Sequence, residues 1–460
     1  TGEGQQIRVP GHQIAEMALA KLCLVTGQQK YLDQAKFFLD QRGHTTRTDE
    51  YSQAHKPVVE QDEAVGHAVR AAYMYAGMAD VAALTGDTAY IHAIDRIWDN
   101  IVGKKYYITG GIGATSNGEA FGKNYELPNM SAYCETCAAI GNVYVNYRLF
   151  LLHGEAKYYD VLERTLYNGL ISGVSLDGGG FFYPNPLESI GQHQRQPWFG
   201  CACCPSNICR FIPSLPGYVY AVKGKDVYVN LFMSNTSNLK VEGKAVSLEQ
   251  ATHYPWNGDV TIGVNKNNAG QFTMKIRIPG WVRNQVVPSD LYTYSDGKRL
   301  SYTVSAMNPA CAMKSPLRAN SPASVKMSPP LPKPKSYQSC FATFTRKEDV
   351  RSPLYGARYH SSLPLLLTGS CPSRARKSAS GILLTASISV LSMPVSVDDE
   401  LDTDPELRVE LPCVATPKAT LPQVGKQGDT VCHVTLHIER QRTAVDEGVP
   451  VVQRGAVMQH

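Results

Sequence analysis

Three tandem copies of one helical pattern constrain the fold of this chain more than any other feature. The copies span residues 11–43, 66–103 and 136–170, and each runs an apolar helix through a glycine into a second apolar helix. Helix pairs repeated in this way stack as helical hairpins. We therefore expect an α/α barrel, in which the Gly-His starts of the first two copies, with His12 and His67, converge on one lumen.

From about residue 217 the pattern changes from helices to strands. Apolar and polar residues alternate, and Gly, Asn and Asp stand at the expected turns, which is typical of antiparallel strands. The alternation ends near Val304. The sequence thus predicts a helical domain over residues 1–216 and a β-sandwich domain over residues 217–304.

Residues 305–460 differ in composition from both preceding regions. They hold 16 of the 28 prolines, whereas 36 of the 41 aromatic residues lie before them. A hydrophobic core is difficult to build from such a stretch. Two explanations compete, a disordered tail and a reading-frame disruption that replaced a folded segment.

The charge balance excludes several classes of partner. Forty-five Lys and Arg against 40 Asp and Glu give a net charge of +5, too small a bias for a nucleic-acid or polybasic membrane surface. No run of about 18 apolar residues is present that could span a bilayer. Thr1–Pro10 carries no signal-peptide pattern, although the chain also lacks an initiator Met and an upstream segment is conceivable. If the chain assembles, we expect a homodimer.

The placement of the 12 cysteines suggests chemistry rather than cross-linking. Four of them crowd together at Cys201, Cys203, Cys204 and Cys209. Neighbouring cysteines are poor disulfide partners, so a cluster of this kind in a chain without an export signal is typical of a metal or catalytic site. We expect a reducing compartment, the cytoplasm.

One carboxylate and three thiols form a plausible tetrahedral zinc set. They are Glu135 and Cys137 in one segment and Cys203 and Cys204 in another. Both segments are expected at the beginnings of helices, where the helix dipole favours thiolates. The alternative is that these cysteines are small buried hydrophobic residues.

Four further residues are candidates for contact with a ligand. Glu119 lies in a Gly-rich loop, where the backbone can approach a ligand closely, although a loop carboxylate is usually only solvated. His12 and His67 could bond a sugar hydroxyl, or they could cap helices or lie in the core. Tyr183 is an aromatic residue in a turn, where packing is the default explanation.

At this point the motifs resemble those of glycoside hydrolase family 127, the β-L-arabinofuranosidases. The resemblance covers residues 11 to about 304, roughly two thirds of the chain. The motifs that carry it are "PVVEQDEAVGHAVRA", "GGIGATSNGEAF", "YELPN", "YCETCA", "CACCPSN" and "RIPGW". It implies an (α/α)6 barrel followed by β-sandwich domains, with the first part of the barrel missing from this chain. Because the resemblance stops after Val304, the frame-disruption explanation is favoured for the stretch that follows.

The resemblance also implies roles for the candidate residues. Glu119 would be the general acid/base and Cys203 the nucleophile of a retaining hydrolysis. Glu135, Cys137, Cys203 and Cys204 would bind Zn²⁺, and His12, His67 and Tyr183 would contact the arabinose ring.

The expected partner is an arabinofuranosyl oligosaccharide or glycopeptide of plant type, from which terminal β-L-arabinofuranose is released. Two alternatives stay open. The chain could be a same-fold hydrolase of another pentose-like sugar, or a non-catalytic, zinc-stabilised carbohydrate-binding protein. Glu119 together with Cys203 separates an enzyme from a binder, since a binder would have little use for an acid beside a thiolate.

Overall fold

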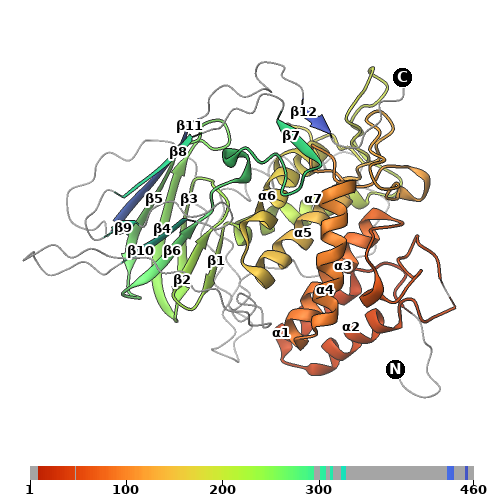
Figure 1. The fold of residues 1–460 in the computed structure, drawn as a ribbon, viewed down its shortest axis with the longest axis horizontal. Coiled ribbons are helices and arrows are strands. Elements are labelled where there is room, and N and C mark those ends of the chain that lie inside the picture. The colour runs from red at the N-terminus through yellow and green to blue at the C-terminus, as the bar shows by residue number, and fades with distance from the viewer. Residues whose placement is uncertain are drawn as a thin grey trace, which may run out of the picture.

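Helices precede strands along the chain, as the sequence predicts (Figure 1). The computed structural model describes residues 9–46, 48–294, 301–306, 311–313, 323–327, 432–439 and 451–453. Within these ranges, no helix combines the length and the apolar character needed to cross a membrane.

The three hairpins predicted from the repeat are present. Their first helices end at Gly27, Gly86 and Gly154, which adopt left-handed φ angles of 67°, 75° and 72°. Glycine adopts this conformation without strain and ends a helix by bonding back to its last turn. The six helices are α1 (Ala15–Thr26), α2 (Gln29–Gln41), α3 (Ala68–Thr85), α4 (Thr88–Asn100), α5 (Thr136–His153) and α6 (Ala156–Arg164).

Helix α3 lies between α1 and α5 and forms much of the helical core. Small residues allow the close approach of α3 and α5. A Cβ atom added at Gly141 of α5 would lie 2.8 Å from the Cβ of Ala72 on α3, nearer than real Cβ contacts come. The closed ring of hairpins stays a prediction.

A last helix, α7 (Cys203–Phe211), packs against α5 and brings the cysteine-rich segment to the helical core. Short helical turns connect the main elements. They are η1 (Val58–Glu60), η2 (Ile101–Lys105), η3 (Asn117–Glu119), η4 (Thr165–Leu170), η5 (Ile171–Gly173), η6 (Ile212–Tyr218) and η7 (Gly280–Arg283).

The strands form two five-stranded sheets and a two-stranded sheet, ordered β1-β2-β6-β10-β9, β3-β4-β5-β11-β8 and β12-β7. Their bounds are β1 (Tyr220–Lys223), β2 (Asp226–Val229), β3 (Asn235–Val241), β4 (Lys244–Thr252), β5 (Val260–Asn267), β6 (Phe272–Ile276), β7 (Tyr292–Tyr294), β8 (Ser301–Ala306), β9 (Cys311–Met313), β10 (Ala323–Met327), β11 (Cys432–Glu439) and β12 (Val451–Gln453). Alternate residues of the two larger sheets share one core, among them Val227, Met274, Leu248 and Ile262.

Four of these strands come from the Pro-rich stretch 305–460. Strand β10 pairs with β6 and β9, β11 pairs with β5 and β8, and β12 pairs with β7. The remainder of the stretch, and with it the predicted disorder or frame disruption, lies outside the described residues.

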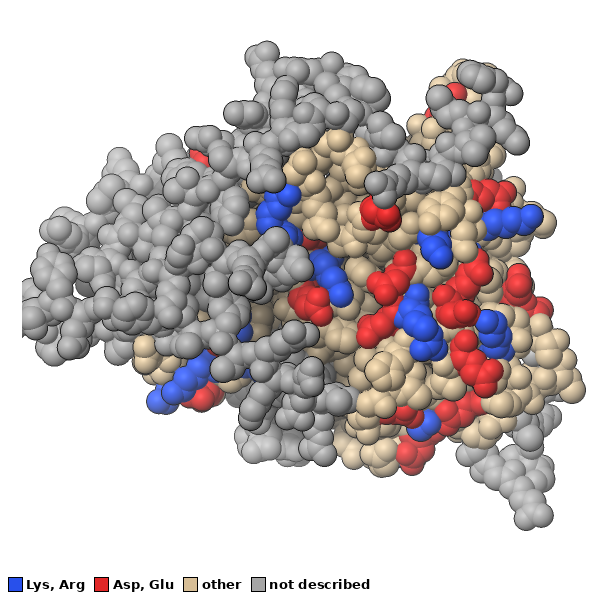
Figure 2. Space-filling model, in the orientation of Figure 1, with Lys and Arg blue, Asp and Glu red and all other residues tan. Residues whose placement is uncertain are grey.

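A buried charge cluster joins the helical region to the strands. Arg277, which follows β6, is 1% exposed, and its guanidinium donates to Asp160 Oδ1 on α6 at 2.8 Å and to Glu163 on the same helix. The Nε–H of Arg277 also donates to the carbonyl of Asn230 at 2.7 Å. A buried arginine with two carboxylate partners fixes the two regions against each other. On the face shown in Figure 2, acidic and basic side chains of the described residues are interspersed over the helices.

Candidate active site

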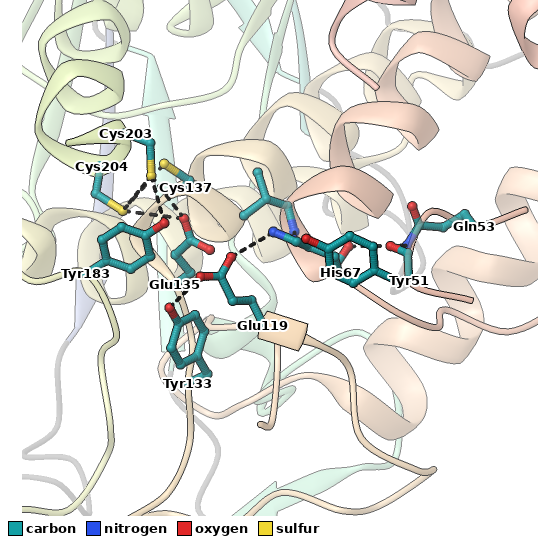
Figure 3. A network of polar contacts seen from close by, with 11 residues as sticks. Tyr51, Gln53, His67, Glu119, Tyr133, Glu135, Cys137, Tyr183, Cys203 and Cys204 are labelled. Atoms are coloured by element: carbon teal, nitrogen blue, oxygen red, sulfur yellow. Dashed lines mark hydrogen bonds and ion pairs between the residues drawn. The ribbon is translucent and has the colours of Figure 1, made fainter. Parts of the chain in front are cut away.

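Two helix beginnings bring one carboxylate and three thiols together. Glu135 immediately precedes α5 and Cys137 lies in its first turn, while Cys203 and Cys204 open α7. One ligand atom from each of the four residues lies within 4.8 Å of all the others. Figure 3 shows the sulfur atoms facing the Glu135 carboxylate. The sequence thus selected residues from segments far apart in the chain that the fold does bring together.

The ligand atoms of this cluster lie close enough together to share one cation. The sulfur of Cys204 lies 3.5 Å from that of Cys137 and 3.5 Å from Glu135 Oε1, and the sulfur of Cys203 lies 3.6 Å from the same oxygen. Glu135 is 3% exposed, and its Oε2 is buried with no hydrogen-bond partner among the residues that the structure describes. An unpaired buried carboxylate oxygen is costly, so its presence beside three sulfurs favours a bound metal over small buried hydrophobic cysteines. The four residues could hold a metal ion.

Burial and neighbouring sulfurs set the electrostatics of the cluster. Burial, followed by the nearby Cys203 and Glu119, raises the pKa of Glu135 to about 9. Hydrogen bonds from the Cys137 and Cys204 thiols lower the pKa of Cys203. These shifts favour a thiolate at Cys203 and a protonated carboxyl at Glu135 when no cation is bound. A divalent cation would favour the ionised form of both.

A second segment of chain positions this cluster from outside. The hydroxyl of Tyr183 lies 3.0 Å from the sulfur of Cys203, and the backbone carbonyl of Tyr183 accepts from the N–H of Thr136 at 3.0 Å. Asn185 donates its side-chain amide to the carbonyl of Cys134 at 2.9 Å and to the hydroxyl of Thr136 at 3.0 Å. Cys134 itself has a left-handed φ of 41°, which is uncommon for a residue with a Cβ. Contacts on both sides of Glu135 thus hold its backbone in place.

The Gly-rich loop places Glu119 beside the cluster. Glu119 also has a left-handed φ, 52°, and its loop is tied to the start of α3 by a bond from the N–H of Phe121 to the carbonyl of Gly66 at 2.9 Å. The hydroxyl of Tyr133 donates to Glu119 Oε1 at 2.9 Å, and His67 Nε2 lies 2.7 Å from Oε2. Ligand atoms of Glu119, His67 and Glu135 lie within 4.8 Å of one another. The loop carboxylate is therefore held by partners and not merely solvated.

His67 acts here as a neutral hydrogen-bond donor. Its Nδ1 accepts from the N–H of Val69 at 3.2 Å, so the ring proton is on Nε2, which faces Glu119. Burial, followed by the charge of Arg70, lowers the pKa of His67 to about 4 and keeps the ring neutral at neutral pH. His12 is exposed, with its ring centroid 6.5 Å from that of His67 and 5.9 Å from that of Tyr73.

Sequence reasoning missed two residues of this arrangement, Tyr133 and Asn185. A signal for Tyr133 was available, because it stands in the motif "YCETCA" two residues before Glu135. Asn185 gave no such signal, since its role depends on a contact with a segment about 50 residues earlier.

Both the helical region and the strands that follow it match known proteins. The family model described as "Beta-L-arabinofuranosidase, GH127 catalytic domain" matches residues 1–217. The model of the GH127 middle domain matches residues 226–302. A non-reducing end β-L-arabinofuranosidase from Bifidobacterium longum subsp. longum is 36% identical over 318 residues, covering 61% of this chain and 48% of that protein.

Solved structures give the same result. One described as the GH127 β-arabinofuranosidase BT3674 has 68% sequence identity and a TM-score of 0.68. The match covers 71% of this chain and 51% of the BT3674 chain. A GH127 β-L-arabinofuranosidase from Geobacillus stearothermophilus T6 has 37% sequence identity and a TM-score of 0.60. That match covers 72% of this chain and 56% of the Geobacillus chain.

This chain spans about half the length of the relatives that it matches. Both family models nevertheless fit in the order in which the helices and strands occur, and together they extend over most of residues 1–302. The chain belongs to glycoside hydrolase family 127.

Proposed function

We propose that this chain is a retaining glycoside hydrolase that releases terminal β-L-arabinofuranose from plant-type oligosaccharides or glycopeptides. Cys203 is the nucleophile and Glu119 the general acid/base. The observation that carries the proposal is that Glu135 has ligand atoms close to both, to the sulfur of Cys203 at 3.6 Å and to Glu119 within 4.8 Å. A nucleophile and a proton donor near one point are what a double displacement at an anomeric carbon requires.

The metal that we propose is Zn²⁺, held by Glu135, Cys137, Cys203 and Cys204. Three thiolates and one carboxylate are a donor set that zinc accepts, and the unpaired Oε2 of Glu135 supports a bound cation. When bound, zinc would keep the ligand sulfurs deprotonated at neutral pH.

The first half-reaction forms a thioglycoside. The sulfur of Cys203 attacks the anomeric carbon, the bond from that carbon to the leaving oxygen breaks, and the leaving oxygen takes the proton of Glu119. The hydroxyl of Tyr183, 3.0 Å from the attacking sulfur, helps to fix its direction.

The second half-reaction restores the enzyme. Glu119 takes a proton from water, the water oxygen attacks the anomeric carbon, and the carbon–sulfur bond breaks to return the thiolate of Cys203. His12, His67 and Tyr183 are our proposed contacts to the arabinose ring, and His67 holds Glu119 at the same time.

The cell compartment and the assembly are part of the proposal. The seven cysteines between residues 23 and 209 are all free, which supports a reducing compartment such as the cytoplasm. A homodimer is the assembly to test by sedimentation.

The function is tested by arabinose release from p-nitrophenyl β-L-arabinofuranoside, before and after removal of metal by a chelator. We expect turnover that falls with zinc content and returns when zinc is added back. Stoichiometric zinc without hydrolysis would instead favour the non-catalytic, zinc-stabilised binding protein. Turnover of another pentoside in preference to the arabinoside would change the substrate.

A further inference from the structure

Both carboxylate oxygens of Glu119 are occupied by hydrogen bonds, and this raises a question about its proton. Oε2 lies 2.7 Å from Nε2 of His67, and Oε1 accepts from the hydroxyl of Tyr133 at 2.9 Å. A carboxylate that accepts twice is ready to act as a base. To act as an acid, the same group needs a proton on one oxygen, and a protonated oxygen is a weaker acceptor for the neighbour that donates to it.

His67 cannot reverse its hydrogen bond. Its Nδ1 accepts from the backbone N–H of Val69 at 3.2 Å, so Nε2 always carries the hydrogen that faces Glu119. The ring is also fixed in place, since it is buried and packs edge-on against Tyr51 with centroids 5.3 Å apart. A proton on Oε2 would therefore weaken the hydrogen bond from Nε2 of His67, and the ring has no other way to bond that oxygen.

The hydroxyl of Tyr133 differs, because it turns about one C–O bond and can accept as well as donate. Resting on the function proposed above, the geometry points to Tyr133 as a positioning residue that decides where Glu119 carries its proton. In the acid form the proton is on Oε1, and the Tyr133 hydroxyl turns so that it no longer donates to that oxygen. In the base form it donates to Oε1 again, and His67 bonds Oε2 throughout.

Tyr133→Phe tests this role through the leaving group. A good leaving group such as p-nitrophenolate departs without a proton, whereas a sugar alcohol needs one. We expect Tyr133→Phe to lower kcat/KM for an arabinosyl disaccharide about tenfold more than for p-nitrophenyl arabinofuranoside, because proton transfer typically contributes 10²- to 10⁴-fold. Since both substrates are assayed on one sample, the ratio of the two rates does not depend on the fraction of folded or metal-loaded protein.

Tyr183→Phe is the matched control. It also removes one hydroxyl from the site, but one that contacts the sulfur of Cys203, so it should affect both substrates by the same factor. An equal loss on both substrates for Tyr133→Phe, or no loss on either, would overturn the role of Tyr133.

Glu119→Gln separates this inference from the proposed function. It should show the same preference for the good leaving group as Tyr133→Phe, and more strongly. If Glu119→Gln treats both substrates alike, the acid role of Glu119 is wrong, and the proposed function fails with it. If Glu119→Gln prefers the good leaving group but Tyr133→Phe lowers the rates on both substrates equally, the function stands and the positioning role of Tyr133 is wrong.

Discussion

Two buried groups of charged residues in this protein are built on opposite principles. At the junction between helices and strands, Arg277 supplies a cation to the carboxylates of Asp160 and Glu163. At the site, Glu135 and its three cysteines supply only acceptors and acidic protons, and no ion pair to Glu135 is formed within the described residues. A buried carboxylate with its own cation contributes to the fold, whereas one without a cation indicates a place for a ligand.

Removing the nucleophile should have the largest effect. Cys203→Ala deletes the only group that we expect to bond the anomeric carbon, so kcat should fall on the order of 10⁴-fold or more. The rate of arabinose release by the purified variant checks this. Cys209→Ala, which removes an exposed cysteine of the same helix, is the control and should retain full activity. Near-native turnover by Cys203→Ala would show that the nucleophile lies elsewhere.

Removing the built-in cation should cost stability and leave the metal in place. Arg277→Leu leaves Glu163 buried without its cation and Asp160 with only Arg283, whose Nη2 lies 3.7 Å from Oδ2, and we expect a loss of about 3–5 kcal/mol in the free energy of unfolding. Urea denaturation of the metal-loaded protein measures this loss. Zinc content per chain should stay equal to that of the wild type. A stability change below about 1 kcal/mol, the range of an exposed ion pair, would mean that the cluster is solvated.

The metal-free site should give opposite pH dependences in two variants. The pKa of Glu135 is raised in the folded state, so its contribution to stability is present below its unfolded pKa and is lost as pH rises towards about 9. The pKa of Cys203 is lowered, so its contribution is present above its unfolded pKa and is lost as pH falls. In the wild type, the changes in the free energy of unfolding with pH that come from Glu135 and from Cys203 have opposite signs between about pH 5 and 9.

With chelator present, Cys203→Ala should therefore lose stability as pH rises over this range, and Glu135→Gln should gain it. Urea midpoints at several pH values give both slopes. Slopes of the same sign in the two variants would contradict this account of the cluster.

A smaller effect is expected from the support of the site. Asn185→Ala removes donors to the carbonyl of Cys134 and the hydroxyl of Thr136, the residues on either side of Glu135. Loss of such support typically lowers metal affinity 10- to 100-fold, and we expect about tenfold here. Competition with a zinc-binding dye measures the change. Asn168→Ala, which removes an exposed bond to the carbonyl of Arg164, should leave zinc affinity unchanged.

The helical hairpins and the metal-ligand candidates could be predicted from the sequence because their signals are local. Glycines at fixed places in a repeat mark where helices end, and cysteines gathered in short motifs mark a shared ligand. Tyr133 and the neutral state of His67 depend on contacts made only after folding. The Nδ1 of His67 meets the N–H of Val69 because α3 begins there, and this determines which nitrogen carries the hydrogen.

The same limit applies to Arg277. In the sequence it is the first residue of the motif "RIPGW", at the end of an alternating strand pattern, and neither feature indicates that α6 will meet it. The partners Asp160 and Glu163 lie more than 100 residues earlier. Pairing over that separation depends on how the strands pack against the helices, which local patterns do not encode.

The position of Arg277 determines how this protein can be shortened. A fragment that stops after α7 would expose the face of α6 on which Asp160 and Glu163 lie, and these carboxylates would then repel each other without the guanidinium between them. Expression of the helices alone should therefore give a product that is less stable than the longer chain. Any minimal version intended for crystallisation or screening has to extend at least through β6 and the residue that follows it.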